Sequence, residues 1–265
     1  MTSLGGRTVR LWERDGDGPP IVLIAGCGLA MDFWRDVADL LPRARLVSYD
    51  RPGIGGTRWP GTLPRLADEQ ATLVDLLERL GAPAVLVAHS MASFIVEAVT
   101  RIRPELVAGV VMVDGSVEWP VTPPRHLTPR LAQWVERATE GSTMGALGAF
   151  VWHVGTWFQS TREFRHLHGG RLADIYADTD TLAAATAESL AYGRQAWDLI
   201  EVRRAHAWPD RPTVVLTAAD NRWLASQRRW ANMLGAGHLV VTGSKHLMML
   251  DRPDAIVEAV EELRR

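Results

Sequence analysis

Short runs of apolar residues alternate with segments of helical periodicity over the first 114 positions. Residues 21–25, 84–87 and 107–113 are continuous apolar runs, typical of strands that are buried on both faces. Between two of these runs, residues 66–80 repeat leucine with a 3.6-residue period and stop before Gly81, which predicts an amphipathic helix. This alternation predicts an α/β fold with a doubly wound, mostly parallel sheet.

The same patterns predict the remaining elements of that sheet. The other expected strands are residues 9–12, 45–49, 214–217 and 239–241, and the other expected helices are residues 29–41, 90–102, 221–234 and 254–263. No buried-strand run occurs within residues 115–208, which hold helical stretches and six of the chain's 11 tryptophans. We therefore expect a core of residues 1–114 and 209–265, with residues 115–208 inserted into it as a separate unit.

Charge and cysteine content exclude several classes of protein. The net charge is −2, from 29 basic and 31 acidic residues, so nothing favours binding of nucleic acid or of an anionic membrane surface. The apolar runs are too short to span a membrane, and the first 13 residues lack the apolar stretch of a signal peptide. Cys27 is the single cysteine, so no disulfide forms within the chain. We expect a cytoplasmic protein, and the sequence leaves its oligomeric state open.

Ser90 lies between a buried strand and an amphipathic helix, in the segment Ala88-His-Ser-Met-Ala92. Small residues two before and two after a serine allow strand and helix to pack closely, and the tight turn between them exposes the hydroxyl. The backbone N–H of Met91 would then point from a helix N-terminus, where an oxyanion is favoured. The alternative is that Ser90 only caps the helix, because serine is a common N-cap. His89 leaves the turn in another direction and is a poor candidate for the base.

Four motifs in order resemble the α/β-hydrolase superfamily. Residues 23–27 with Phe33 and Trp34 resemble a strand that ends in His-Gly, although Ala25 replaces the histidine. Residues 49–57 are similar to the Tyr-Asp-x-x-Gly-x-Gly-x-Ser loop of that family. The Ser90 turn resembles the G-x-S-x-G motif with alanine at both glycine positions. A late strand followed by Asp220, and then His246, completes the resemblance.

The resemblance implies a catalytic triad of Ser90, His246 and Asp220. His246 would accept the serine proton and Asp220 would orient the imidazole. Asp114, which ends the strand of residues 107–113, is the alternative acid, because some members of the superfamily use that position. The backbone N–H groups of Met91 and Cys27 would form the oxyanion hole. Such a site needs no cofactor.

Other motifs give weaker signals. His166 and His168 are two residues apart, but no further histidine or cysteine completes a metal-ligand pattern, so no metal site is expected. The glycines of residues 51–56 lack the Gly-Lys-Ser/Thr ending of a P-loop and the spacing of a dinucleotide fingerprint. We therefore interpret that segment as a turn beside the active site.

Residues 115–208 lie where members of the α/β-hydrolase superfamily carry an insertion that forms a helical cap over the serine. The resemblance therefore implies that these residues form such a cap. Trp119, Trp152 and Trp157 are the candidates for lining the substrate pocket, although most aromatic residues of such a segment pack the cap onto the core. We expect a serine hydrolase acting on an ester, lactone or thioester of an apolar, ring-containing small molecule. One alternative uses the same triad for C–C bond hydrolysis, lyase or cyclase chemistry, and another is a ligand-binding receptor with slow or no turnover.

Overall fold

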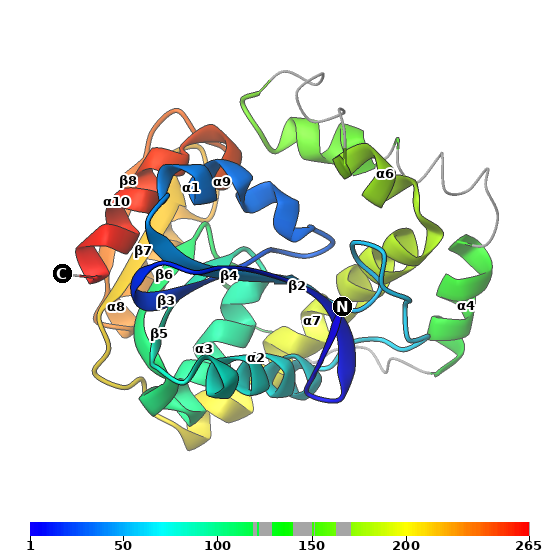
Figure 1. Ribbon diagram of the computed structural model, residues 1–265, viewed down its shortest axis with the longest axis horizontal. Coiled ribbons are helices and arrows are strands. Elements are labelled where there is room, and N and C mark those ends of the chain that lie inside the picture. Colours follow the sequence, from blue (N-terminus) through cyan, green and yellow to red (C-terminus); the bar gives the residue numbers. More distant parts are fainter. Residues whose placement is uncertain (119–120, 122–128, 140–149, 151, 163–170, 265) are drawn as a thin grey trace.

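A single sheet of eight strands forms the centre of the molecule (Figure 1). The computed structural model describes residues 1–118, 121, 129–139, 150, 152–162 and 171–264. The strand order is β1-β2-β4-β3-β5-β6-β7-β8, and every pair from β4 to β8 is parallel, whereas β1–β2 and β2–β4 are antiparallel. The strands are β1 (Thr2–Leu4), β2 (Arg7–Arg14), β3 (Asp17–Ile24), β4 (Ala44–Asp50), β5 (Ala84–His89), β6 (Val107–Val113), β7 (Thr213–Ala218) and β8 (Gly237–Val241).

Helices cover both faces of this sheet, as the doubly wound prediction requires. The helices of the sheet-forming part are α1 (Arg35–Leu40), α2 (Leu66–Leu80), α3 (Ala92–Ile102), α8 (Leu224–Met233), α9 (Met248–Asp251) and α10 (Pro253–Leu263). Ile21 and Leu23 of β3 pack in the hydrophobic cluster that includes Ile256 of α10. The alternate residue Val22 packs in the cluster of the opposite face, with Leu73 of α2. The two-residue period of a strand thus fills both layers.

Several element boundaries differ from those expected from the sequence. Helix α2 has the expected bounds, because Gly81 adopts the left-handed conformation, with φ of 70°, that ends it. The segment expected as one helix from residue 29 to 41 instead begins as the 3₁₀ helix η1 (Met31–Trp34) and continues as α1. A second 3₁₀ helix, η2 (Pro104–Leu106), precedes β6. The strand expected at residues 9–12 is β2, which is longer than expected. It pairs with β1, a strand that the sequence pattern does not predict.

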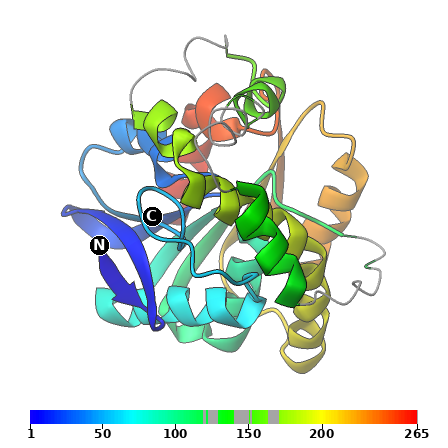
Figure 2. The same ribbon diagram turned by 90° about the vertical axis from the view of Figure 1, so that its right-hand side faces the viewer.

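Between β6 and β7 the described chain is helical and lies to one side of the sheet. It contains α4 (Pro129–Thr139), a helical segment at 152–158, α6 (Arg171–Ala177) and the long helix α7 (Thr179–Ala205). Figure 2 views the molecule from that side and shows these green to yellow helices in front of the strands. Helix α7 contacts α4 and α6 as well as α2 and α3. It therefore joins the rest of this segment to the sheet-forming part.

Candidate active site

Ser90 occupies a sharp turn between β5 and α3. Its φ is +52°, a left-handed conformation that is uncommon for residues other than glycine. Several hydrogen bonds hold the turn: Ser90 N–H donates to the Val113 carbonyl (3.2 Å), and the Ser90 carbonyl accepts from Ser93 N–H (3.0 Å) and from Ser116 N–H (3.1 Å). Residues Ala88 and Ala92, on either side of the turn, are fully buried, so a larger side chain at either position would have to displace packed neighbours. Such a strained strand–turn–helix is typical of a nucleophilic serine, because it exposes the hydroxyl group.

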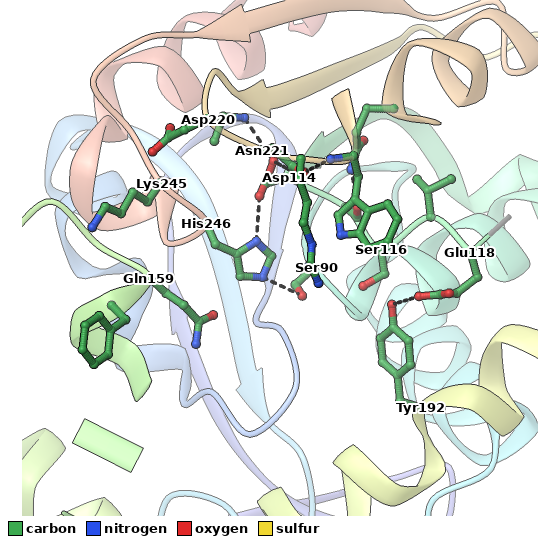
Figure 3. Close-up of a pocket in the computed structure, with 17 residues that line it drawn as sticks. Ser90, Asp114, Ser116, Glu118, Gln159, Tyr192, Asp220, Asn221, Lys245 and His246 are labelled. Carbon is green, nitrogen blue, oxygen red and sulfur yellow. Dashed lines mark hydrogen bonds and ion pairs between the residues drawn. The ribbon is translucent and has the colours of Figure 1, made fainter. Parts of the chain in front are cut away.

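Ser90, His246 and Asp114 form a hydrogen-bonded line (Figure 3). Ser90 Oγ lies 2.9 Å from His246 Nε2, and His246 Nδ1 lies 2.7 Å from Asp114 Oδ2. A carboxylate only accepts, so Nδ1 of a neutral imidazole carries the proton and Nε2 can accept the serine proton. His246 lies in the loop between β8 and α9, and Asp114 directly follows β6. Asp114 is also left-handed, with φ of +42°.

Asp114, not Asp220, is the carboxylate that contacts His246. The chain turns directly after β7, where Asn221 N–H donates to the Ala218 carbonyl (3.0 Å). That turn brings the Asn221 side chain to Asp114, so Asn221 Nδ2 donates to Asp114 Oδ1 (2.7 Å) together with Ala218 N–H (3.0 Å). Asp220 is exposed and lies on the pocket wall. The assignment of Asp220 as the partner of His246 is therefore corrected to Asp114, which the sequence offered only as the alternative.

The end of β3 lies directly against the serine turn. A Cβ added to Gly26 would be 2.9 Å from Ser90 Cβ and 2.7 Å from His89 Nδ1, closer than real side chains approach. The next residue is Cys27, whose N–H has no acceptor among the described residues; the same holds for Met91 N–H at the start of α3. Burial, and then the nearby charge of Glu188, raise the pKa of the Cys27 thiol to about 11. The thiol therefore stays protonated near neutral pH and is a weak nucleophile.

Two pockets meet at Ser90 and His246. The larger, of about 620 Å³, has a mixed wall, in which Val117, Phe158 and Trp223 lie beside polar side chains that include Ser116, Glu118, Gln159, Tyr192, Asp220, Arg222 and Lys245. The smaller, of about 260 Å³, is lined by Cys27, Leu29, His89, Trp152, Gly155, Thr156 and Gln159. Figure 3 shows Gln159 on one side of Ser90, and Tyr192 with Glu118 on the other. Tyr192 Oη donates to Glu118 Oε1 (2.7 Å).

The three tryptophans expected in the pocket have different positions. Trp152 lines the smaller pocket and stacks on Tyr176, with ring centroids 3.2 Å apart. Trp157 is 41% exposed, packs against Phe158 and belongs to neither pocket wall. Trp119 lies outside the described residues, so its expected place in the pocket stays a prediction.

His89, which the sequence analysis rates as a poor candidate for the base, lies beside His246 in the site. It is 1% exposed, and its ring centroid lies 4.6 Å from that of His246. Its Nε2 lies 2.9 Å from the His246 carbonyl oxygen, which only accepts, so Nε2 carries the proton. Burial, followed by repulsion from His246, lowers the pKa of His89 well below the usual value. A neutral His89 thus ties the turn before Ser90 to the loop that carries His246.

Within the described ranges, no group of three His, Cys, Asp or Glu side chains is arranged to hold a metal ion. His166 and His168 lie outside those ranges. No described helix is long and apolar enough to cross a bilayer.

Comparison with known proteins agrees with the fold. The alpha/beta hydrolase family matches residues 21–259, so the chain belongs to that family and is a hydrolase-type enzyme. A curated relative is (E)-2-((N-methylformamido)methylene)succinate hydrolase of Acinetobacter baylyi, 23% identical over 262 residues, which are 96% of this chain and 93% of the relative.

Solved structures share the fold over nearly the whole chain. Cfl2 from Burkholderia cenocepacia has a TM-score of 0.76 at 21% identity and covers 100% of this chain and 94% of its own. The enol-lactonase from Burkholderia xenovorans has a TM-score of 0.71 at 20% identity, and the match covers 99% of this chain and 98% of the enol-lactonase. A thermophilic esterase from Thermogutta terrifontis has a TM-score of 0.72 at 17% identity, and the match covers 97% of this chain and 94% of the esterase.

The contact between Gly26 and the serine turn predicts the effect of one added methyl group. Gly26→Ala should lower the free energy of unfolding by about 1–3 kcal/mol, because the new Cβ overlaps Ser90 and His89. Gly193→Ala in helix α7 is the matched control: nothing lies within 4 Å of its added Cβ, and alanine favours a helix by about 0.5–1 kcal/mol. Urea unfolding of both variants measures the difference. Equal stability of the two would contradict the close contact.

The buried neutral His89 predicts how stability depends on pH. The pKa of His89 is lower in the folded than in the unfolded chain, so the unfolded chain binds the extra proton. Its contribution to stability is therefore complete above about pH 6.5 and is lost as the pH falls below that value. His89→Gln keeps an N–H donor but does not titrate, so its urea midpoint should fall less between pH 7 and pH 5. An unchanged pH slope would show that His89 is not responsible.

Proposed function

We propose that this protein is a serine hydrolase that cleaves an ester, lactone or thioester through an acyl-enzyme. The observation that carries the proposal is the unbroken line from Ser90 Oγ through His246 to the Asp114 carboxylate. A serine hydroxyl is a poor nucleophile by itself, and this arrangement supplies the base and fixes its tautomer. Asp114 is 2% exposed and accepts two further hydrogen bonds, from Ala218 N–H and Asn221 Nδ2, which hold its carboxylate in place beside the imidazole.

The geometry supports the following sequence of steps. Ser90 Oγ attacks the substrate carbonyl as its proton passes to His246 Nε2, and the carbonyl oxygen becomes an oxyanion. The N–H groups of Cys27 and Met91 donate to that oxyanion. His246 then gives its proton to the leaving oxygen or sulfur, and the acyl group remains on Ser90. A water molecule loses its proton to His246 and attacks the acyl carbon. The bond from that carbon to Ser90 Oγ then breaks, the carboxylic acid leaves, and His246 returns the proton to Ser90 Oγ.

The two pockets support a substrate with unlike ends. The smaller pocket offers Leu29 and the Trp152 ring, which suit a compact apolar or ring-containing group. The larger pocket offers charged and hydroxyl side chains, which suit a polar remainder of the molecule. The helices of residues 115–208 act in this proposal as a cap that excludes water from the serine. An entirely apolar substrate would leave the polar wall without partners.

A fluorophosphonate probe together with a simple aryl ester tests the proposal. The probe should label the wild-type chain at Ser90, and 4-nitrophenyl acetate should be hydrolysed with a burst of nitrophenol. Ser90→Ala should remove both signals and leave the melting temperature within a few degrees, because only one oxygen is lost. An unlabelled wild-type chain would refute the activated serine. Labelling without ester turnover would instead favour the lyase, cyclase or receptor alternatives.

The identity of the acid gives a second test. Asp114→Asn should lower kcat by roughly 10³–10⁴-fold, because an amide at this position favours the wrong imidazole tautomer. Asp220→Asn is the matched control and should change kcat by less than about twofold, because Asp220 is exposed and does not contact His246. Steady-state kinetics at saturating ester measures both. The reverse result would return the role of the acid to Asp220.

A further inference from the structure

A buried ion pair lies behind the loop that carries Cys27. Arg51, just after β4, and Glu188 of α7 have side chains only 3% and 4% exposed. Arg51 Nε donates to Glu188 Oε1 (2.6 Å), and Arg51 Nη2 donates to Glu188 Oε2 (2.8 Å). Removing two charges from water costs free energy. That cost is large unless the other donors and acceptors of the two side chains also form hydrogen bonds.

Both partners use their remaining hydrogen-bonding groups on the backbone of residues 25–28. Arg51 donates to the Ala25 carbonyl (2.6 Å) and to the Gly26 carbonyl (2.5 Å). From the other side, Gly28 N–H donates to Glu188 Oε2 (2.6 Å). The ion pair therefore binds backbone groups on both sides of Cys27.

These contacts fix the direction of the Cys27 N–H. A trans peptide is planar and its C=O and N–H point in opposite directions. Arg51 holds the Gly26 carbonyl, so the Cys27 N–H of the same peptide unit points away from Arg51. Glu188 holds the Gly28 N–H and thereby fixes the following peptide unit. One ion pair thus contacts both peptide planes that flank the Cys27 Cα, and Leu29 N–H also donates to the Gly26 carbonyl (3.1 Å).

We propose that Arg51 and Glu188 are positioning residues of the oxyanion hole, an inference that rests on the proposed serine hydrolase activity. Their function is to hold the Cys27 N–H in the direction that the developing oxyanion requires. Stability alone does not call for charges here, because well-packed apolar residues can replace a buried ion pair without loss. Glu188 also belongs to α7, so the position of this helix and the shape of the oxyanion hole are coupled.

Glu188→Gln tests the proposal against a matched control. The glutamine has the same size, but it loses the charge and one of the two acceptor oxygens that Arg51 and Gly28 share. We expect kcat for 4-nitrophenyl acetate to fall by about 10–100-fold with KM within about threefold, because one oxyanion donor is worth about 10²–10³ in rate and here it is displaced, not removed. The affinity for phenylboronic acid, whose tetrahedral adduct places an oxygen in the oxyanion hole, should fall by a similar factor.

Glu97→Gln is the control, because Glu97 is also fully buried and binds Arg101 and Arg203, but its carboxylate does not contact residues 25–28. It should lower the melting temperature, yet leave kcat and boronate affinity within twofold. If Glu188→Gln shows that same pattern, the ion pair is only structural and the proposal is wrong.

Two further measurements keep the test decisive. If Glu188→Gln does not melt cooperatively, Arg51→Lys takes its place, because lysine keeps the charge but cannot bind both carbonyls and both carboxylate oxygens in the same geometry. Unchanged kcat and boronate affinity in Arg51→Lys would overturn the proposal. Failure of the underlying hydrolase function is recognised separately, since the wild-type chain would then neither react with the fluorophosphonate nor hydrolyse the ester.

Discussion

The sharp reversal of the backbone at Ser90 is the constraint on which the rest of the site depends. It brings the start of α3 back over the end of β5 and leaves no room for a side chain on the adjacent strand end, where Gly26 lies. Because β3, β5 and β6 are parallel neighbours, their carboxyl ends meet at one edge of the sheet. Ser90, the loop that carries Cys27 and Asp114 are therefore neighbours in space although they are far apart along the chain.

The backbone strain of this arrangement is located at two residues that directly follow buried strands. Ser90 and Asp114 both have positive φ, which costs about 1–3 kcal/mol for each such residue. Each of them follows a strand whose apolar side chains are almost completely buried on both faces. The packing of those buried strands can offset this cost and hold the two strained residues in place.

The sequence was most informative where a local pattern determines the structure. Helix α2 ends at Gly81 because a left-handed residue must stop it, and the buried strands follow from their continuous apolar runs. Ser90 and His246 are predicted as partners because motifs surround them, and their side chains lie within hydrogen-bond distance of each other. Asp220 was misplaced because the choice between two acids depends on how the chain turns after β7, which is decided by contacts of Ala218 and Asn221 with a distant strand end. The ion pair of Arg51 and Glu188 joins residues 137 positions apart, and no spacing rule could have revealed it.

Lys245 is the only lysine in the chain, and it lies on the wall of the larger pocket, next to His246. Reagents that couple to primary amines therefore have one side-chain target, apart from the α-amino group at the start of the chain. Dyes or crosslinkers attached in this way would report on, or obstruct, the entrance to the serine. Immobilisation through amines would turn the active-site face of the enzyme toward the support.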